Sequence, residues 1–155
     1  MRGASPLALR SLLQREHIVV DWRGPALGWL QPPQATVTIM IGLRGTLGMT
    51  DGAPLPKAWI GGLGGDCAAV EMSGDFSALD VQLTPLGARG LLGLPLHEIA
   101  GQVVPLEEIL GQAAARTLSA GTRSGGCWVL SRIFRFCRES FMREFCKLGF
   151  GSAQL

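Results

Sequence analysis

The chain has 155 residues, of which 47% are hydrophobic and 17% are charged, and this composition is typical of a globular domain with its own core. It excludes a disordered chain, and no apolar run approaches the roughly 20 residues that a membrane-spanning helix requires. The formal net charge is +2. No secretory signal follows Met1, so the sequence predicts a cytoplasmic protein.

The charge is unevenly distributed along the chain. Residues 1–121 contain eight Lys and Arg against ten Asp and Glu, whereas residues 122–155 contain six against two. The second part also holds five of the six Phe and three of the four Cys. This change of composition predicts a boundary near Gly121, between a domain at 1–121 and a basic, Phe-rich tail at 122–155.

The first half of the chain shows mainly strand signals. A short helix is expected over Leu7 to Glu16, followed by a strand over His17 to Trp22. The β-branched run from Ala35 to Leu43 predicts a strand at the centre of a sheet. Further short strands are expected around Leu47 and Met49 and in three later stretches: 57–62, 67–72 and 76–83.

The stretch from Asp80 to Gly111 changes from strand to helix signals. Val81 and Leu83 fall on one face of a strand, and Asp80 and Gln82 fall on the other. Thr84 can cap a helix that begins at Pro85 and ends at Gly93.

After Gly93, Pro95 predicts a second short helix, and Val103 to Pro105 should be extended. Glu107 and Glu108 then lie in the first turn of a further helix. Strands followed by helices predict an α+β fold, with a short-stranded antiparallel sheet or a partly closed barrel.

The same stretch resembles the end of the N-terminal, sensor-side domain of AraC-type (AraC/XylS) bacterial transcriptional regulators. The family pattern, TP-GA-LLG-P followed by VPL and LLG, is matched without a gap. The matching residues are Thr84, Pro85, Gly87, Ala88, Leu91, Leu92, Gly93, Pro95, Val104, Pro105, Leu106, Leu110 and Gly111. The likeness extends from about Trp22 to about Leu118.

The resemblance implies a regulatory domain that senses a small-molecule effector or forms a homodimer. In this family DNA is bound through a C-terminal helix-turn-helix domain, and that pattern is absent from these 155 residues. Two explanations of the tail therefore remain open: it is the product of a truncation or frameshift, or the chain is a native short variant. The alternative function is a small-molecule binding or protein-interaction module with no role in transcription.

Within the tail, Trp128 to Leu148 predicts one basic amphipathic helix. Such a helix could pack on the sheet domain, dock in a partner's groove or lie on a membrane surface. It offers no turn that would divide it into a helix-turn-helix pair.

Catalytic, metal and cofactor sites are not predicted. His97 is predicted to lie on the surface of a helix. Glu98, Glu107 and Glu108 are predicted to stabilise helix N-termini through their negative charges. Cys67, Cys127, Cys137 and Cys146 contain no C-x-x-C pair, so free thiols are expected rather than a zinc site. The sequence thus indicates a protein that is not an enzyme.

Two features are consistent with the hypothesis of a ligand site, although neither identifies its residues. The glycines from Gly61 to Gly65 could cradle a phosphate, but the Walker lysine is absent and a hairpin connection is favoured. Trp22, Trp29 and Trp59 lie on or beside predicted strands, where one could line an apolar pocket or all could be core residues.

Overall fold

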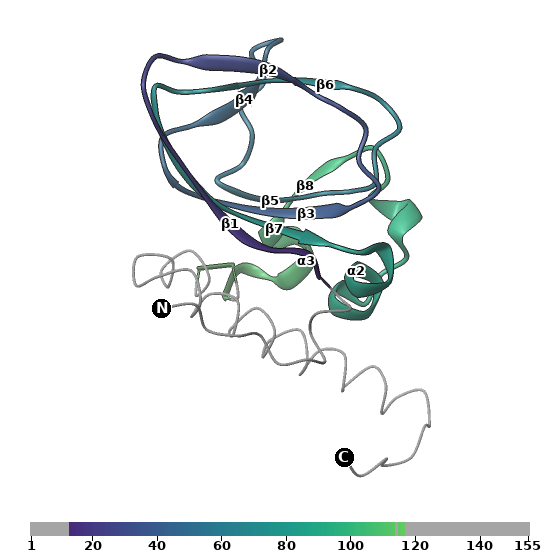
Figure 1. Ribbon diagram of the computed structural model, residues 1–155. Coiled ribbons are helices and arrows are strands. Elements are labelled where there is room, and N and C mark those ends of the chain that lie inside the picture. The colour runs from purple at the N-terminus through teal and green to yellow at the C-terminus, as the bar shows by residue number, and fades with distance from the viewer. Residues whose placement is uncertain (1–12, 114, 117–155) are drawn as a thin grey trace, which may run out of the picture.

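The computed structural model describes residues 13–113 and 115–116 (Figure 1). The predicted tail helix over Trp128 to Leu148 and the predicted boundary near Gly121 lie outside the described residues. The part of the predicted first helix that precedes Leu13 lies outside them too.

Two antiparallel sheets form the body of the described region. The larger has the strand order β1-β7-β3-β5-β8, and the smaller has the order β2-β6-β4. The five strands of the larger sheet are β1 (Leu13–Arg23), β7 (Asp75–Leu83), β3 (Val37–Arg44), β5 (Ala58–Gly61) and β8 (Val103–Pro105). The three strands of the smaller sheet are β2 (Leu27–Gln31), β6 (Ala68–Met72) and β4 (Leu47–Met49).

The chain alternates between the two sheets. Every connection from β1 to β7 crosses from one sheet to the other, and among the described strands no two that are consecutive in sequence pair with each other. The sheets face one another (Figure 1), and both are open rather than joined into a closed barrel. The predicted α+β class with short antiparallel strands is confirmed.

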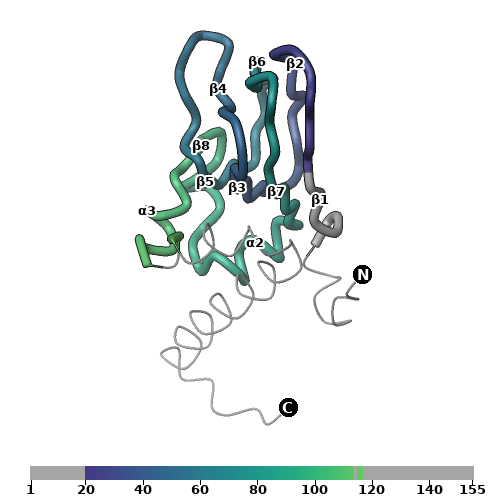
Figure 2. Tube along the Cα trace, turned by 90° about the vertical axis from the view of Figure 1, so that its left-hand side faces the viewer, coloured from purple at the N-terminus to yellow at the C-terminus, as the bar shows by residue number. Residues whose placement is uncertain are grey.

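The helices pack on the outer face of the larger sheet, away from the smaller one (Figure 2). They are α2 (Pro85–Leu92), the 3-10 turn η1 (Leu96–Glu98) and α3 (Leu106–Leu110). The predicted cap of α2 is confirmed, because the Gly87 N–H donates to Thr84 Oγ1 at 3.0 Å. Gly93 ends the helix with a left-handed φ of 67°, a conformation that costs glycine little.

Alternation of side chains along the central strands divides the interior into two clusters. On β3 and β7 one set of alternate residues faces the helices, in a cluster centred on Ile39, Ile60 and Val81. This helix-side cluster confirms that Ile39 and its neighbours share one buried face with Val81 and Leu83. The opposite set, with Phe76 and Ala78, contributes to an inter-sheet cluster, whose other buried members are Leu47, Val70 and Met72.

Three expectations differ from the structure. Leu13 to Glu16 is strand rather than helix, because β1 continues its backbone pairing with β7 as far as Leu13. The segment from Gly61 to Gly65 is not a hairpin connection, since β5 and β6 belong to different sheets. Strand β2 was not predicted: its residues are largely exposed, so its sequence lacks the usual alternation.

Candidate functional site

A cavity of about 540 Å³ lies between the two sheets, within the usual size range of small-molecule sites. Strands of both sheets and the glycine-rich segment after β5 line it. It occupies space that the inter-sheet cluster does not fill, and residues Leu47 and Val70 of that cluster form part of its wall.

The floor of the cavity is the inner face of the larger sheet. Asp80 and Gln82 of β7 lie beside Met40 and Thr38 of β3, to which they are paired in register. The four side chains are half-buried. Gln82 Nε2 donates to Asp80 Oδ2 at 3.3 Å, and the other carboxylate oxygen is shielded from solvent. A carboxylate and an amide therefore lie together on the floor, beside the apolar side chain of Met40 and the hydroxyl of Thr38.

Next to this polar pair, Trp59 supplies an aromatic surface. It is paired with Met40 across β3 and β5 and also lines the cavity. A Cβ atom added at Gly61 would lie 2.9 Å from Cζ3 of Trp59, so the indole ring lies over the glycine. A larger residue at position 61 would have to displace this ring.

The smaller sheet forms the opposite wall. Trp29 on β2, Val70 on β6 and Met49 on β4 make one row across the sheet, and all three line the cavity. The indole N–H of Trp29 donates to Gln31 Oε1 at 3.0 Å. Since that donor is already engaged, Trp29 offers a ligand mainly its ring surface.

The glycine-rich segment forms part of the rim and is fixed to the loop before β8. Gly62 N–H donates to Gln102 O at 3.0 Å, and Gly101 N–H donates to Leu63 O at 2.8 Å. A Cβ at Gly62 would lie 1.8 Å from the backbone oxygen of Ile99, a separation that no side chain can occupy. Glycine is required here by close backbone packing, which is a structural role.

The charged side chains that line the cavity are acidic as far as the described residues go. Asp80 lies on the floor, and the exposed residues Asp51 and Asp66 lie at the rim. Of the described residues that line the cavity, none is Lys, Arg or His. Near the glycine-rich segment, the exposed carboxylate of Asp66 disfavours a phosphate.

Metal binding receives no support from the described region, where no group of three or more His, Cys, Asp or Glu side chains could hold a metal ion. The carboxylates of Asp51, Asp66 and Asp80 thus give the cavity its charge without forming such a group.

The three tryptophans differ in their surroundings. Trp29 and Trp59 line the cavity, and Trp59 also packs against the inter-sheet cluster. Trp22 packs against that cluster as well, and its indole N–H donates to Pro25 O at 2.9 Å. Cys67 is an exposed free thiol at the rim.

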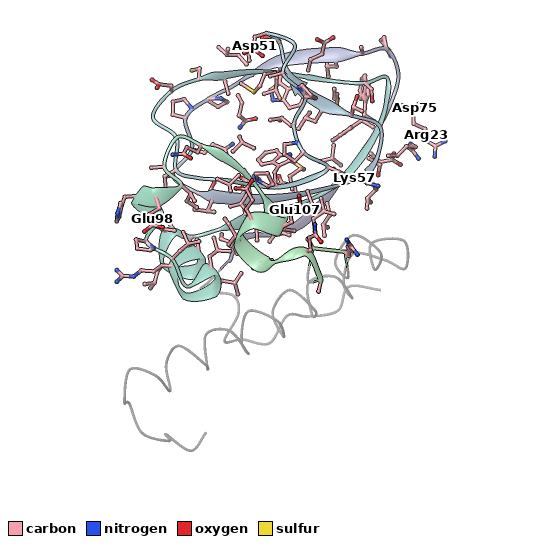
Figure 3. All side chains as sticks on the ribbon, turned by 180° about the vertical axis from the view of Figure 1, so that it is seen from behind. Arg23, Asp51, Lys57, Asp75, Glu98 and Glu107 are labelled. Carbon is pink, nitrogen blue, oxygen red and sulfur yellow. The ribbon has the colours of Figure 1, made fainter. Side chains whose placement is uncertain are left out.

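The other candidate residues lie on the helical side. Glu107 and Glu108 occupy the first turn of α3, and His97 is exposed in η1. In Figure 3, Glu98 and Glu107 lie by the helices, far from Asp51. None of these four side chains lines the cavity.

Asp80 and Gln82 were placed on the correct face of their strand by sequence alone but were not predicted as site residues. The available signal was two polar side chains that alternate with the apolar residues Leu79, Val81 and Leu83 along one strand. A central strand, buried on both faces, would not normally carry them.

Comparison of the chain with protein-family models, with curated proteins and with solved structures found no match. Across the described part of the chain, every helix is too short or too polar to cross a bilayer.

Proposed function

We propose that this chain is the N-terminal regulatory domain of an AraC-type transcriptional regulator and that it senses an effector in the cavity between its sheets. The observation that carries the proposal is the cavity itself, lined by two tryptophans and a fixed polar pair. Sites for small molecules typically combine an apolar lining with a few placed polar groups.

The family resemblance supports the transcriptional part of the proposal. Its matched residues run from Thr84 to Gly111 and include both ends of α2 and the start of α3. The loop between η1 and β8 is hydrogen-bonded to the glycine-rich segment of the rim. The segment that resembles the family is therefore in direct contact with the proposed effector site.

Effector binding is tested by titrating the chain with a small-molecule library and following tryptophan fluorescence. We expect saturable changes with at least one compound, because Trp29 and Trp59 line the cavity. Ala68→Phe should abolish the change, since Ala68 lines the cavity and packs toward the inter-sheet cluster.

Glu71→Phe, at an exposed position of the same strand, is the matched control and should bind like the unmodified chain. Binding that survives Ala68→Phe, or no saturable change with any compound, would contradict an effector site in this cavity.

The transcriptional role is tested separately. If DNA reading belongs to a helix-turn-helix region outside these 155 residues, the chain alone should bind promoter and scrambled fragments equally, with affinity that falls steeply with salt. Fluorescence anisotropy at physiological salt measures this, and a strong preference for one promoter fragment would contradict it.

The nucleotide sequence beyond the codon for Leu155 provides a second test, since a helix-turn-helix coding region in any frame would support the family assignment. Without one, the cavity would favour the alternative function, a small-molecule binding module with no role in transcription.

A further inference from the structure

We infer that the effector carries a flat aromatic ring, that this ring binds against the indole of Trp59, and that Gly61 positions the indole to receive it. This inference rests on the proposed function, because it names the chemical class of ligand that the same cavity takes. It depends on the side chains that surround Trp59 and on the absence of a side chain at Gly61.

One part of the cavity wall consists of apolar side chains from both sheets. Six of the lining residues also belong to the inter-sheet cluster or pack against it, and we call them the apolar wall: Met40, Leu47, Leu55, Trp59, Ala68 and Val70. Leu55 N–H donates to Leu47 O at 3.0 Å, which holds the segment after β4 beside that strand. An apolar part of a ligand that contacts this wall is removed from water together with the wall, and the burial of both surfaces favours binding.

The indole of Trp59 turns its edge toward Gly61. A Cβ atom added at Gly61 would lie 2.9 Å from Cζ3 of the ring, but 3.7 and 3.9 Å from Cε3 and Cη2, the two ring atoms bonded to Cζ3. A position above the face of the ring would have more similar distances to these three atoms. Contact with Gly61 therefore leaves the faces of the indole uncovered, and Trp59 is half-buried and lines the cavity.

The surroundings of Trp59 favour an aromatic ring over a saturated one. Aromatic pairs attract each other beyond the effect of the apolar area that they bury. Met40, which is paired with Trp59 across β3 and β5 and also lines the cavity, adds a thioether sulfur, and sulfur makes favourable contacts with aromatic rings. The cavity volume of about 540 Å³ accommodates a molecule with one or two rings.

Gly61 is a positioning residue in this site. A methyl group at position 61 would be too close to Cζ3 of Trp59, so the indole would have to turn. Gly61 is not one of the described glycines with positive φ, so its backbone conformation is open to alanine. Alanine at this position therefore acts on the ring of Trp59 rather than on the strand.

The test compares two neutral probes that differ in the flatness of the ring, 2-phenylethanol and 2-cyclohexylethanol. Dissociation constants are measured with the full chain by saturation-transfer NMR. We expect 2-phenylethanol to bind about threefold to tenfold more tightly. Hydrophobic burial alone would not give this order, because the saturated ring has at least as much apolar surface as the flat one.

Two variants test the residues. Trp59→Leu removes the indole and Gly61→Ala displaces it, so in both we expect the ratio of the two dissociation constants to fall to about one. Gly28→Ala is the matched control, because Gly28 is a strand glycine that does not line the cavity, and a Cβ there would make only an ordinary contact of 3.6 Å with Val70 O. It should keep the ratio of the unmodified chain, and thermal melting verifies the folding of all three variants.

Several results would overturn the inference. Equal affinity of the unmodified chain for the two alcohols would show that the ligand class is wrong, although the cavity would still bind a ligand. A preference for the flat ring that survives Trp59→Leu or Gly61→Ala would remove that residue from the site, and a preference that is also lost in Gly28→Ala would contradict the role of Gly61.

If neither alcohol showed saturable binding, an aromatic ring at Trp59 would be excluded, whereas the effector role would still be decided by the library titration with Ala68→Phe. The comparison of the two alcohols on the unmodified chain requires no variant, so it decides the ligand class even if a variant does not fold.

Discussion

At Gly62, the absence of a side chain allows the rim of the cavity to form. A methyl group there would overlap the backbone oxygen of Ile99, and a backbone atom cannot move aside as a flexible side chain can. The neighbouring Gly64 has open space where its side chain would be. Of these two glycines in one segment, Gly64 has room for a side chain and Gly62 has none.

We predict that Gly62→Ala lowers the free energy of unfolding by about 1–3 kcal/mol, because the loop around Ile99 must shift to accept the methyl group. Thermal or denaturant unfolding measures the change. Gly64→Ala is the control and should leave stability unchanged or slightly raised, since alanine restricts the unfolded chain. Equal effects of the two substitutions would show that the close approach to Ile99 is not important.

Ile39 is the most informative residue of the helix-side cluster, because its side chain is fully buried at the centre of β3. We predict that Ile39→Asp abolishes cooperative unfolding. An unpaired buried charge costs several kcal/mol, which approaches the entire stability of a small domain, about 5–15 kcal/mol.

The control for Ile39→Asp is Leu86→Asp, which makes a similar aliphatic-to-acidic change at a side chain that is 75% exposed in the first turn of α2. It should be tolerated, because a negative charge near a helix N-terminus is favourable. An Ile39→Asp chain that melts like the unmodified one would be inconsistent with the buried position.

At the scale of single elements, α2 depends on its two ends. It is short, and isolated helices of this length are not stable in water, so its caps and its packing on β7 must maintain it. Thr84 accepts the N–H of Gly87, and Gly93 supplies the left-handed residue that ends the helix.

We predict that Thr84→Ala destabilises the domain by about 1 kcal/mol, the usual cost of losing an N-cap. Thr84→Ser retains the hydroxyl and should recover most of that loss. Urea unfolding of the three chains makes the comparison, and equal midpoints for Thr84→Ala and Thr84→Ser would exclude capping as the reason for threonine at this position.

The elements that sequence reasoning predicted correctly are those whose signals are local. Thr84, Pro85 and Gly93 determine the ends of α2 through the properties of single residues, and the alternation of β3 is visible along one stretch. Strand β2 and the first residues of β1 were missed because they are held by pairing with β6 and β7, which come much later in the chain.

The cavity could not be predicted from the sequence either, because the residues that line it are far apart along the chain. Its floor, walls and rim come from strands of both sheets, and no single stretch contains more than a part of it. Trp29 and Trp59 could be named as candidates from their type and position, whereas Asp80 becomes a site residue only when the smaller sheet is placed opposite β7.

For the molecule as a whole, β7 joins the two clusters. Its alternate residues Leu79 and Val81 belong to the helix-side cluster, and Phe76 and Ala78 belong to the inter-sheet cluster. Because one strand belongs to both, neither cluster can be lost while the other remains intact.

We therefore predict that the described region unfolds in one cooperative transition. Ile60→Ala in the helix-side cluster and Met72→Ala in the inter-sheet cluster should each lower stability by about 2–5 kcal/mol and move the same transition. Guanidinium unfolding followed by tryptophan fluorescence and by circular dichroism tests this. Separate midpoints for the two probes, in either variant, would indicate that the clusters unfold independently.

The alternation of the chain between sheets has a consequence for the rate at which the domain forms. Because consecutive described strands never pair, no β-hairpin can nucleate the larger sheet: β3 pairs first with β5, and β1 must wait for β7, which begins at Asp75. Long loops must be closed before any pairing compensates for their entropy, and topologies of this kind fold in milliseconds to seconds rather than microseconds. During synthesis, β1 leaves the ribosome long before β7, which is its partner strand among the described residues, so β1 stays unpaired until β7 has been made.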